Sequence, residues 1–214
     1  MIQLHARRIE RRPSWMTPRT RDDGGGAQRQ TRTKAPTIQT RNKGPTMTLD
    51  LAQTITLLGG TIATGLMAGV FSLYAHTIMR GLGATDDRTF VGAFQAIDRA
   101  IINPIFMATF FGAFVLDGAA AALQLGDGGR GVLAFTIAAF ALYLSVVAIT
   151  VVVHVPLNDR IKAAGDAREI ADVAPIRVRF QETRWATWNT VRAAATTIAF
   201  GCLTWALVLQ GRTT

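Results

Sequence analysis

The chain has 214 residues, of which 49% are hydrophobic and 17% charged, and its formal net charge is +9. Soluble domains carry about 25% charged residues, so this composition disfavours a soluble domain. Eleven of the 23 Lys and Arg residues fall within residues 1–46. No basic face interleaved with aromatic residues recurs in residues 47–214, and we therefore expect no nucleic-acid partner.

Residues 1–46 are rich in Arg, Thr, Gln, Gly and Pro. Such a segment buries too little apolar surface to offset its ordering entropy, so we expect a disordered basic tail. No apolar core follows the early arginines, which argues against a secretory signal. Two interpretations of the tail stay open: the gene start is placed too early and translation begins at Met47, or the tail is a basic arm for anionic lipid headgroups.

Residues 47–214 contain four long apolar segments. A helix needs about 20 apolar residues to cross a bilayer core. Segments of this kind lie at about residues 55–79, 101–125, 132–153 and 190–210. We therefore predict an all-α fold, in which one membrane domain forms a four-helix transmembrane bundle. Asp117 is the only acidic residue within the four segments. An intramembrane carboxylate is a functional candidate, but we favour one that snorkels to the membrane surface or caps a helix end.

The connections between the segments carry further helix signals. After "GATDDRTF", in which Thr85 or Asp86 can cap a helix, four apolar residues recur at helical spacing: Phe90, Phe94, Ile97 and Ile101. This pattern predicts an amphipathic helix at the membrane interface. Pro104 suits the start of the second span. We expect Pro156 and Asn158 to end the third span, and a single helix to run from Ile176 through the fourth.

The predicted topology collects unusual polar residues at one end of the bundle. The first and third spans end there, and the second and fourth begin there. The candidate site residues are His76, Gln95, Asn103, His154, Asn158, Trp185, Trp188, Asn189 and Arg192. A histidine can act as a general base near neutral pH, although two interfacial histidines can also simply hold their tips in water. Two histidines without a nearby carboxylate or cysteine form a weak metal signature, so we expect no metal.

Three strings of the sequence together resemble the anthrone oxygenase-like membrane family: "YAHTIMRGLGATDDRTFVGAFQAIDRAIINPIFMATFFGA", "VPLND" and "WATWNTVR". The resemblance covers about residues 55–210. It implies a four-span bundle that oxidises an anthrone to an anthraquinone with molecular oxygen and no bound cofactor. The positions that match the family are Gln95, Asn103, Pro104, Pro156, Asn158, Trp185, Asn189 and Arg192. The sequence departs from the family at Arg80, Asp98 and His154, where Pro, Asn and Asn are usual.

The chemistry implied by this resemblance suits the polar cluster. A base, His154 or His76, would remove a ring proton from the anthrone. Arg192, Asn158 and Asn189 would stabilise the resulting enolate oxygen, and Trp185 and Trp188 would stack on the flat ligand. Two other function classes stay open. One is a non-enzymatic structural or partner subunit. The other is a transporter or redox carrier, which the absence of an internal repeat disfavours.

The distribution of basic residues predicts the orientation. The loops on the side of the polar cluster contain ten Lys and Arg residues, against four near the opposite ends of the spans. Cytoplasmic loops carry the excess of Lys and Arg, so we expect the cluster to face the cytoplasm, although counting the whole tail reverses the result. We expect a multi-pass protein of the bacterial cytoplasmic membrane, with the lipid bilayer and an apolar aromatic small molecule as its partners.

Overall fold

The structure is a computed structural model, and it describes residues 44–127 and 129–212. Every regular element within these residues is a helix. The helical segments that are long and apolar enough to cross a membrane are Met47–Gly83, Pro104–Gly126, Arg130–Lys162 and Ala174–Gly211. The predicted four-helix transmembrane bundle is confirmed, and the chain is an integral membrane protein. The predicted tail lies outside the described residues except for residues 44–46, which begin the first helix rather than extending the tail.

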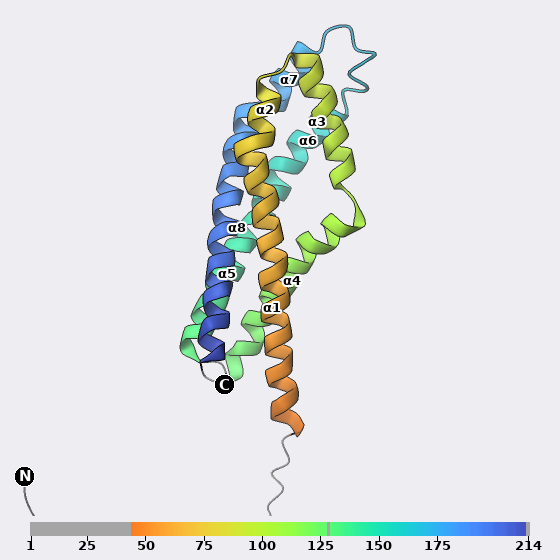
Figure 1. The fold of residues 1–214 in the computed structure, drawn as a ribbon. Helices are drawn as coiled ribbons and strands as arrows, with labels where there is room; N and C mark the ends of the chain where they lie inside the picture. Colours follow the sequence, from red (N-terminus) through yellow and green to blue (C-terminus); the bar gives the residue numbers. More distant parts are fainter. Residues whose placement is uncertain (1–43, 128, 213–214) are drawn as a thin grey trace, which may run out of the picture. The chain divides into compact units, whose positions relative to one another are not determined.

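Each span is built from one to three consecutive elements (Figure 1). The first contains α1 (Gly44–Leu73), the π-helical turn η1 (Tyr74–Ile78) and α2 (Met79–Gly83). Next come the connecting helix α3 (Asp87–Ile101) and the second span, α4 (Pro104–Asp127). The third contains α5 (Arg130–Ile149), the π-helical turn η2 (Thr150–His154) and α6 (Val155–Lys162). The fourth contains α7 (Ala174–Phe180) and α8 (Glu182–Gly211).

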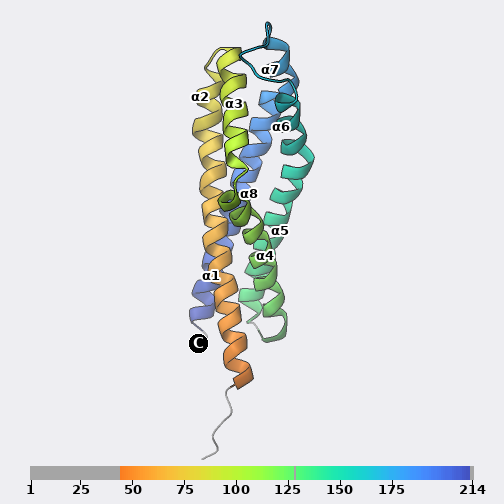
Figure 2. The same ribbon diagram turned by 90° about the vertical axis from the view of Figure 1, so that its right-hand side faces the viewer.

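The four long helices pack in a closed ring. α1 packs against α4 and α8, and α5 packs against the same two helices (Figures 1 and 2). In the half of the bundle that contains the end of α4 and the start of α5, small residues such as Ala120, Ala139 and Ala199 are buried and allow close helix approach. Large apolar side chains such as Leu58 and Ile62 are exposed on the outside. Such a surface suits a lipid environment.

α3 begins at a side-chain cap, as its sequence predicts. The backbone N–H of Thr89 donates to Asp86 Oδ1 at 3.0 Å, and its hydroxyl donates to Oδ2 at 2.6 Å. Phe90 and Phe94 are buried on one face of the helix and pack against Phe180. The amphipathic helix therefore exists, and its position at the membrane interface stays a prediction.

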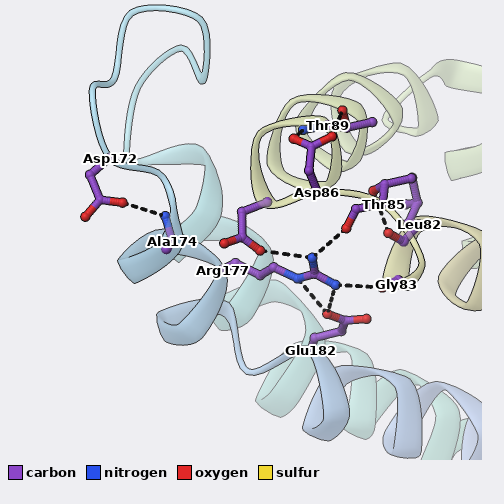
Figure 3. Close-up of polar contacts among 10 residues, drawn as sticks. Leu82, Gly83, Thr85, Asp86, Thr89, Asp172, Ala174, Arg177 and Glu182 are labelled. Carbon is purple, nitrogen blue, oxygen red and sulfur yellow. Dashed lines mark hydrogen bonds and ion pairs between the residues drawn. The ribbon is translucent and has the colours of Figure 1, made fainter.

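A single arginine ties the connection before α3 to α7 and α8 (Figure 3). The Arg177 guanidinium donates to the carbonyls of Gly83 and Thr85 and to the carboxylates of Asp87 and Glu182, at 2.8–3.1 Å. The same guanidinium lies 4.3 Å from the centre of the Phe90 ring. These contacts fix the outer end of α3 against the bundle.

Two predicted helix ends are wrong. Pro156 and Asn158 do not end the third span, because α6 continues to Lys162. Proline cannot donate a backbone hydrogen bond, and here it follows the wider η2 turn, in which the N–H of Val155 donates to the carbonyl of Thr150. The fourth span is not one helix from Ile176, because Gln181 adopts a left-handed conformation (φ 57°) that separates α7 from α8.

Asp117 neither snorkels nor caps a helix end. Its side chain is fully buried between α1 and α4, where the Thr64 hydroxyl donates to Oδ2 at 2.9 Å. Its Oδ1 has no hydrogen-bond partner among the described residues. Gly60 makes room for this atom, since a methyl group added at Gly60 would come within 2.5 Å of Oδ1.

Candidate functional site

A cavity of about 280 Å³ lies at the end of the bundle where α3 and α6 cover the long helices. Its walls are largely apolar and aromatic, with contributions from α1, α3, α4, α6 and α8. The polar side chains that line it are Tyr74, Asp98, Thr150, His154, Asn158, Asp159, Lys162 and Arg192. The cavity therefore combines apolar and aromatic walls with a cluster of polar groups, a composition that suits a small-molecule site.

Both π-helical turns border this cavity. Tyr74 lies in η1, and Thr150 and His154 lie in η2. A π-helical turn widens the helix by one residue and redirects the side chains that follow, and such turns occur frequently at functional sites. Their presence in two facing spans, at the same cavity, sets this end of the bundle apart.

Arg192 is a buried cation without an acidic partner in the described part of the chain. Its Nη1 donates to Thr150 Oγ1 at 3.0 Å, and its Nη2 donates to Asn189 Oδ1 at 2.8 Å. The guanidinium carbon lies 4.3 Å from the centre of the Phe71 ring. The Nε atom is buried and makes no hydrogen bond with any described residue. A charge held in this way favours an anionic or strongly polar oxygen in the cavity.

His154 is buried beside Arg192 and packs edge-on against Trp185, with 4.8 Å between the ring centres. Its Nδ1 lies 3.4 Å from the carbonyl oxygen of Ile149. A proton on Nδ1 would point at that carbonyl, leaving a lone pair on Nε2. Nε2 has no hydrogen-bond partner among the described residues. This arrangement would suit a general base.

Asn158 connects the indole of Trp185 to an acidic group. Trp185 Nε1 donates to Asn158 Oδ1 at 2.8 Å, and Asn158 Nδ2 donates to Asp98 Oδ1 at 2.6 Å. The other oxygen of Asp98 forms an ion pair with Lys162 at 3.2 Å. Asn158 therefore orients the tryptophan ring on the cavity wall, and its amide is already engaged on both sides.

The structure brings part of the predicted site together. His154, Asn158, Trp185 and Arg192 line the cavity, and Asn189 lies behind Arg192, where its Nδ2 donates to the carbonyl of Phe71 at 3.1 Å. Their roles in binding or catalysis stay predictions.

Four other predicted site residues lie outside the cavity lining: His76, Gln95, Asn103 and Trp188. His76 is exposed, with Nδ1 2.7 Å from the hydroxyl of Thr77, and Trp188 is also exposed. Gln95 donates to the carbonyls of Ile161 and Gly165, and Asn103 caps α4. The rotation of a helix about its own axis decides which of its side chains enter the cavity. Residues near the same end of a span can therefore face different sides.

Sequence reasoning missed five polar residues of the cavity lining as site residues: Tyr74, Asp98, Thr150, Asp159 and Lys162. A spacing signal exists for two of them, since Thr150, His154, Asn158 and Lys162 recur at intervals of four residues, which places them near one another on a helix. Tyr74, Asp98 and Asp159 carry no comparable signal. Groups of three or more metal-ligating His, Cys, Asp or Glu side chains are absent from the residues that the structure describes.

The fold and the cavity together define a four-span helical membrane protein with a partly polar, aromatic-walled site at one end. Residues 99–202 match the family model described as anthrone oxygenase, and this match confirms the resemblance that the sequence strings predict. The matched region includes His154, Asn158, Trp185 and Arg192. No curated protein and no solved structure matches the chain.

Proposed function

We propose that the chain oxidises an anthrone-like polycyclic phenol with molecular oxygen, in this cavity and without a cofactor. The observation that carries the proposal is Arg192, a buried guanidinium that lines an aromatic cavity and has no acidic partner among the described residues. The family match supports the same reaction class. The substrate of this reaction becomes an oxyanion when it loses a proton. A buried cation such as Arg192 favours an oxyanion as its ligand.

The cavity suits a flat ligand of moderate size. Its volume of about 280 Å³ lies near the lower end of small-molecule pockets, which span about 300–1,000 Å³. Phe71, Phe94 and Trp185 contribute aromatic surface to its walls. Fused aromatic rings would bury their apolar faces here while placing one oxygen beside the guanidinium.

The proposed reaction begins with a proton transfer. His154 Nε2 takes a proton from the ring carbon opposite the carbonyl, and the electron pair of that C–H bond moves into the ring system to form an enolate. The negative charge collects on the former carbonyl oxygen, where Arg192 stabilises it. Asn189 and Thr150 hold the guanidinium in place through their hydrogen bonds at 2.8 and 3.0 Å.

The enolate then supplies the electrons that reduce oxygen. One electron passes to molecular oxygen, and the resulting superoxide joins the ring-carbon radical to form a peroxide anion. This anion takes the proton back from His154. Loss of the remaining C–H proton and cleavage of the O–O bond release water and leave a second carbonyl. One anthrone and one oxygen molecule thus give one anthraquinone and one water.

The location of the site is part of the same proposal. The excess of Lys and Arg in the loops around the cavity supports a cytoplasmic site. We place the protein in the cytoplasmic membrane of a bacterium, with the bilayer as its surroundings and the aromatic substrate as its ligand.

Oxygen uptake by the purified full-length protein with 1,8-dihydroxyanthrone tests the proposal, after subtraction of the uncatalysed rate. The His154→Gln variant should lose about 100-fold in rate, because a positioned general base contributes about 10²–10⁴-fold. The matched control is His76→Gln, which changes the other histidine of the described region and lies outside the cavity. It should keep the original rate.

Equal rates in the two variants would contradict the role of His154. Binding of the corresponding anthraquinone with no oxygen uptake above background would contradict the enzymatic proposal and favour a non-enzymatic membrane subunit.

A further inference from the structure

We propose that the cavity receives its ligand sideways from the bilayer, through an apolar edge between the α3–α4 turn and η2–α6. The ligand is then a flat, uncharged aromatic compound that is dissolved in the lipid. The ligand class rests on the proposed function. The route itself rests on the shape and polarity of the cavity edges.

The apolar edge of the cavity is continuous with the outer surface of the bundle. Ile102 and Val155 both line the cavity, yet they are 56% and 45% exposed. Next to Val155, the η2 residues Val151 and Val152 are also exposed. An apolar ligand moving along this edge would exchange lipid contacts for protein contacts without passing a charge.

The α3–α4 turn is built to face an apolar environment. Figure 1 shows this turn projecting from the bundle. The Asn103 side chain satisfies its backbone groups: Nδ2 donates to the carbonyls of Ala100 and Ile101 at 3.0 and 3.3 Å, and Oδ1 accepts from the N–H of Phe106 at 3.0 Å. Internal satisfaction of backbone polar groups is what a lipid-facing segment requires. This gives Asn103 a structural role although it lies outside the cavity.

About one helical turn further along the same two elements, toward the start of α3 and the end of α6, the edge of the cavity is charged. Lys162 forms ion pairs with Asp98 at 3.2 Å and with Asp159 at 3.1 Å, and the Asp159 side chain is largely exposed. A ligand without charge would have to displace water and separate these groups to pass between them, which is costly. The two edges therefore differ in polarity, and the apolar edge is the one that favours entry of an uncharged ligand from the membrane.

The apolar edge also lies at the level of the membrane-spanning segments. Phe106 and Met107 belong to the span Pro104–Gly126, and Val155 belongs to the span Arg130–Lys162. Val155 lies seven residues before Lys162, the last residue of its span, whereas Asp159 and Lys162 lie in the final turn of that span. Lipid chains would contact the opening directly.

The test measures how fast 1,8-dihydroxyanthraquinone binds to the full-length protein in phosphatidylcholine vesicles, followed by dye fluorescence after rapid mixing. Ile102→Trp narrows the apolar edge and should slow association by about tenfold or more, with a smaller change in equilibrium affinity because dissociation slows as well. Ile105→Trp is the matched control. Ile105 is 81% exposed on the same turn of chain but does not line the cavity, so this variant should bind at the original rate.

Asp159→Trp narrows the charged edge instead and should leave the association rate unchanged. Slower association in Asp159→Trp, together with equal rates in the two isoleucine variants, would overturn the proposal. Failure of the original protein to bind the dye would also overturn it. If Ile102→Trp does not fold, Val155→Trp narrows the same edge from the other helix and has the same expected result.

Oxidation plays no part in this measurement, because the dye already carries both carbonyls of the product. A protein that binds the dye through the Ile102 edge but consumes no oxygen would refute the oxygenase reaction and leave the lateral route intact. If the protein oxidises the anthrone but binds the dye past Asp159, the oxygenase reaction would stand and the lateral route would be refuted.

Discussion

Each half of the bundle buries an Arg or Asp side chain that has no opposite charge among the described residues, Arg192 in one half and Asp117 in the other. The surroundings of the two side chains differ. Arg192 lies at the end that contains both π-helical turns, and it lines a cavity. Asp117 lies between α1 and α4, outside the cavity lining, where Gly60 and Thr64 contact its carboxyl group. One charge has room for a ligand beside it, and the other is closed in by helix packing.

This difference shows that a buried charge in a membrane helix does not identify a site by itself. An intramembrane ionisable residue is a functional hypothesis by default, yet the sequence pattern favours Arg192 as a site residue and favours a snorkelling or capping role for Asp117. The cavity separates them. Near Asp117, the neighbouring helix α1 has a glycine, Gly60, which lets the two helices approach closely. This close contact leaves no space for a ligand beside the carboxyl group.

The largest expected effect comes from removing the buried charge that lines the cavity. Arg192→Met keeps much of the side-chain volume but removes the charge, so the enolate oxygen loses its stabilising partner. The rate of anthrone oxidation should fall by about 100-fold, since removal of one donor to an oxyanion costs about 10²–10³-fold in rate. Oxygen uptake at low substrate concentration measures this loss as a change in kcat/KM.

Arg184→Gln is the matched control for Arg192→Met. Arg184 lies on the same helix, donates only to Gln181 among the described side chains and is exposed. It should oxidise the substrate at the original rate. A similar loss in both variants would mean that positive charge on α8 acts at long range, and the specific role of Arg192 would then be wrong.

The sequence predicts the bundle better than it predicts the site, for a physical reason. Spans follow from the length and polarity of a segment, and the cap at Asp86 follows from local chemistry. Which side of a helix faces the cavity depends on its rotation, and η1 and η2 each add a residue to a turn. His76 lies only two residues after Tyr74, and Trp188 only three after Trp185, yet Tyr74 and Trp185 line the cavity whereas His76 and Trp188 do not.

The next largest effect tests the close packing of α1 and α4 around Asp117. Gly60→Ala places a methyl group 2.5 Å from Asp117 Oδ1 and 3.5 Å from the backbone of Leu116 and Asp117. Overpacking of this kind costs about 1–3 kcal/mol, so the thermal unfolding temperature in detergent should fall. The cost should be smaller when Asp117→Ala is present in the same chain, because the carboxylate that meets the methyl group is then absent.

Gly69→Ala on the same helix is the control for Gly60→Ala. A methyl group there meets nothing within 4 Å, and alanine favours a helix over glycine by about 0.5–1 kcal/mol. This variant should be as stable as the original or slightly more stable. If both alanine variants lost stability equally, the close approach of α1 and α4 at Gly60 would not be what limits this position.

A smaller effect sharpens the description of the cavity wall. Trp185→Phe keeps an aromatic ring but removes the indole N–H, which leaves Asn158 Oδ1 without the donor that holds it at 2.8 Å. Loss of one such hydrogen bond costs about 0.5–1.5 kcal/mol, so affinity for the anthraquinone should fall by up to about tenfold. Trp188→Phe, outside the cavity lining, should bind as the original protein does. Equal affinities in the two variants would show that the orientation of Trp185 is not needed.

The smallest expected effect concerns the helix that covers the cavity. Hydrogen bonds from the side chain and backbone of Thr89 lower the pKa of Asp86 below its ordinary value of 3.8. The folded state therefore favours the ionised carboxylate. Its stabilising contribution is present above about pH 4 and is lost as the pH falls through the lowered pKa.

Asp86→Ala should accordingly unfold at a lower temperature than the original protein at pH 7, and the gap should narrow as the pH falls below about 4. Asp86→Asn keeps an oxygen that can accept from the Thr89 N–H, and because it carries no charge its own contribution should not vary with pH. Thermal unfolding of the three proteins between pH 7 and pH 3 measures both effects. A gap between the alanine variant and the original that stays constant over this range would mean that the charge of Asp86 contributes nothing to the start of α3. The cap would then act through its geometry alone, and α3 would depend mainly on the Arg177 contacts at the same end of the helix.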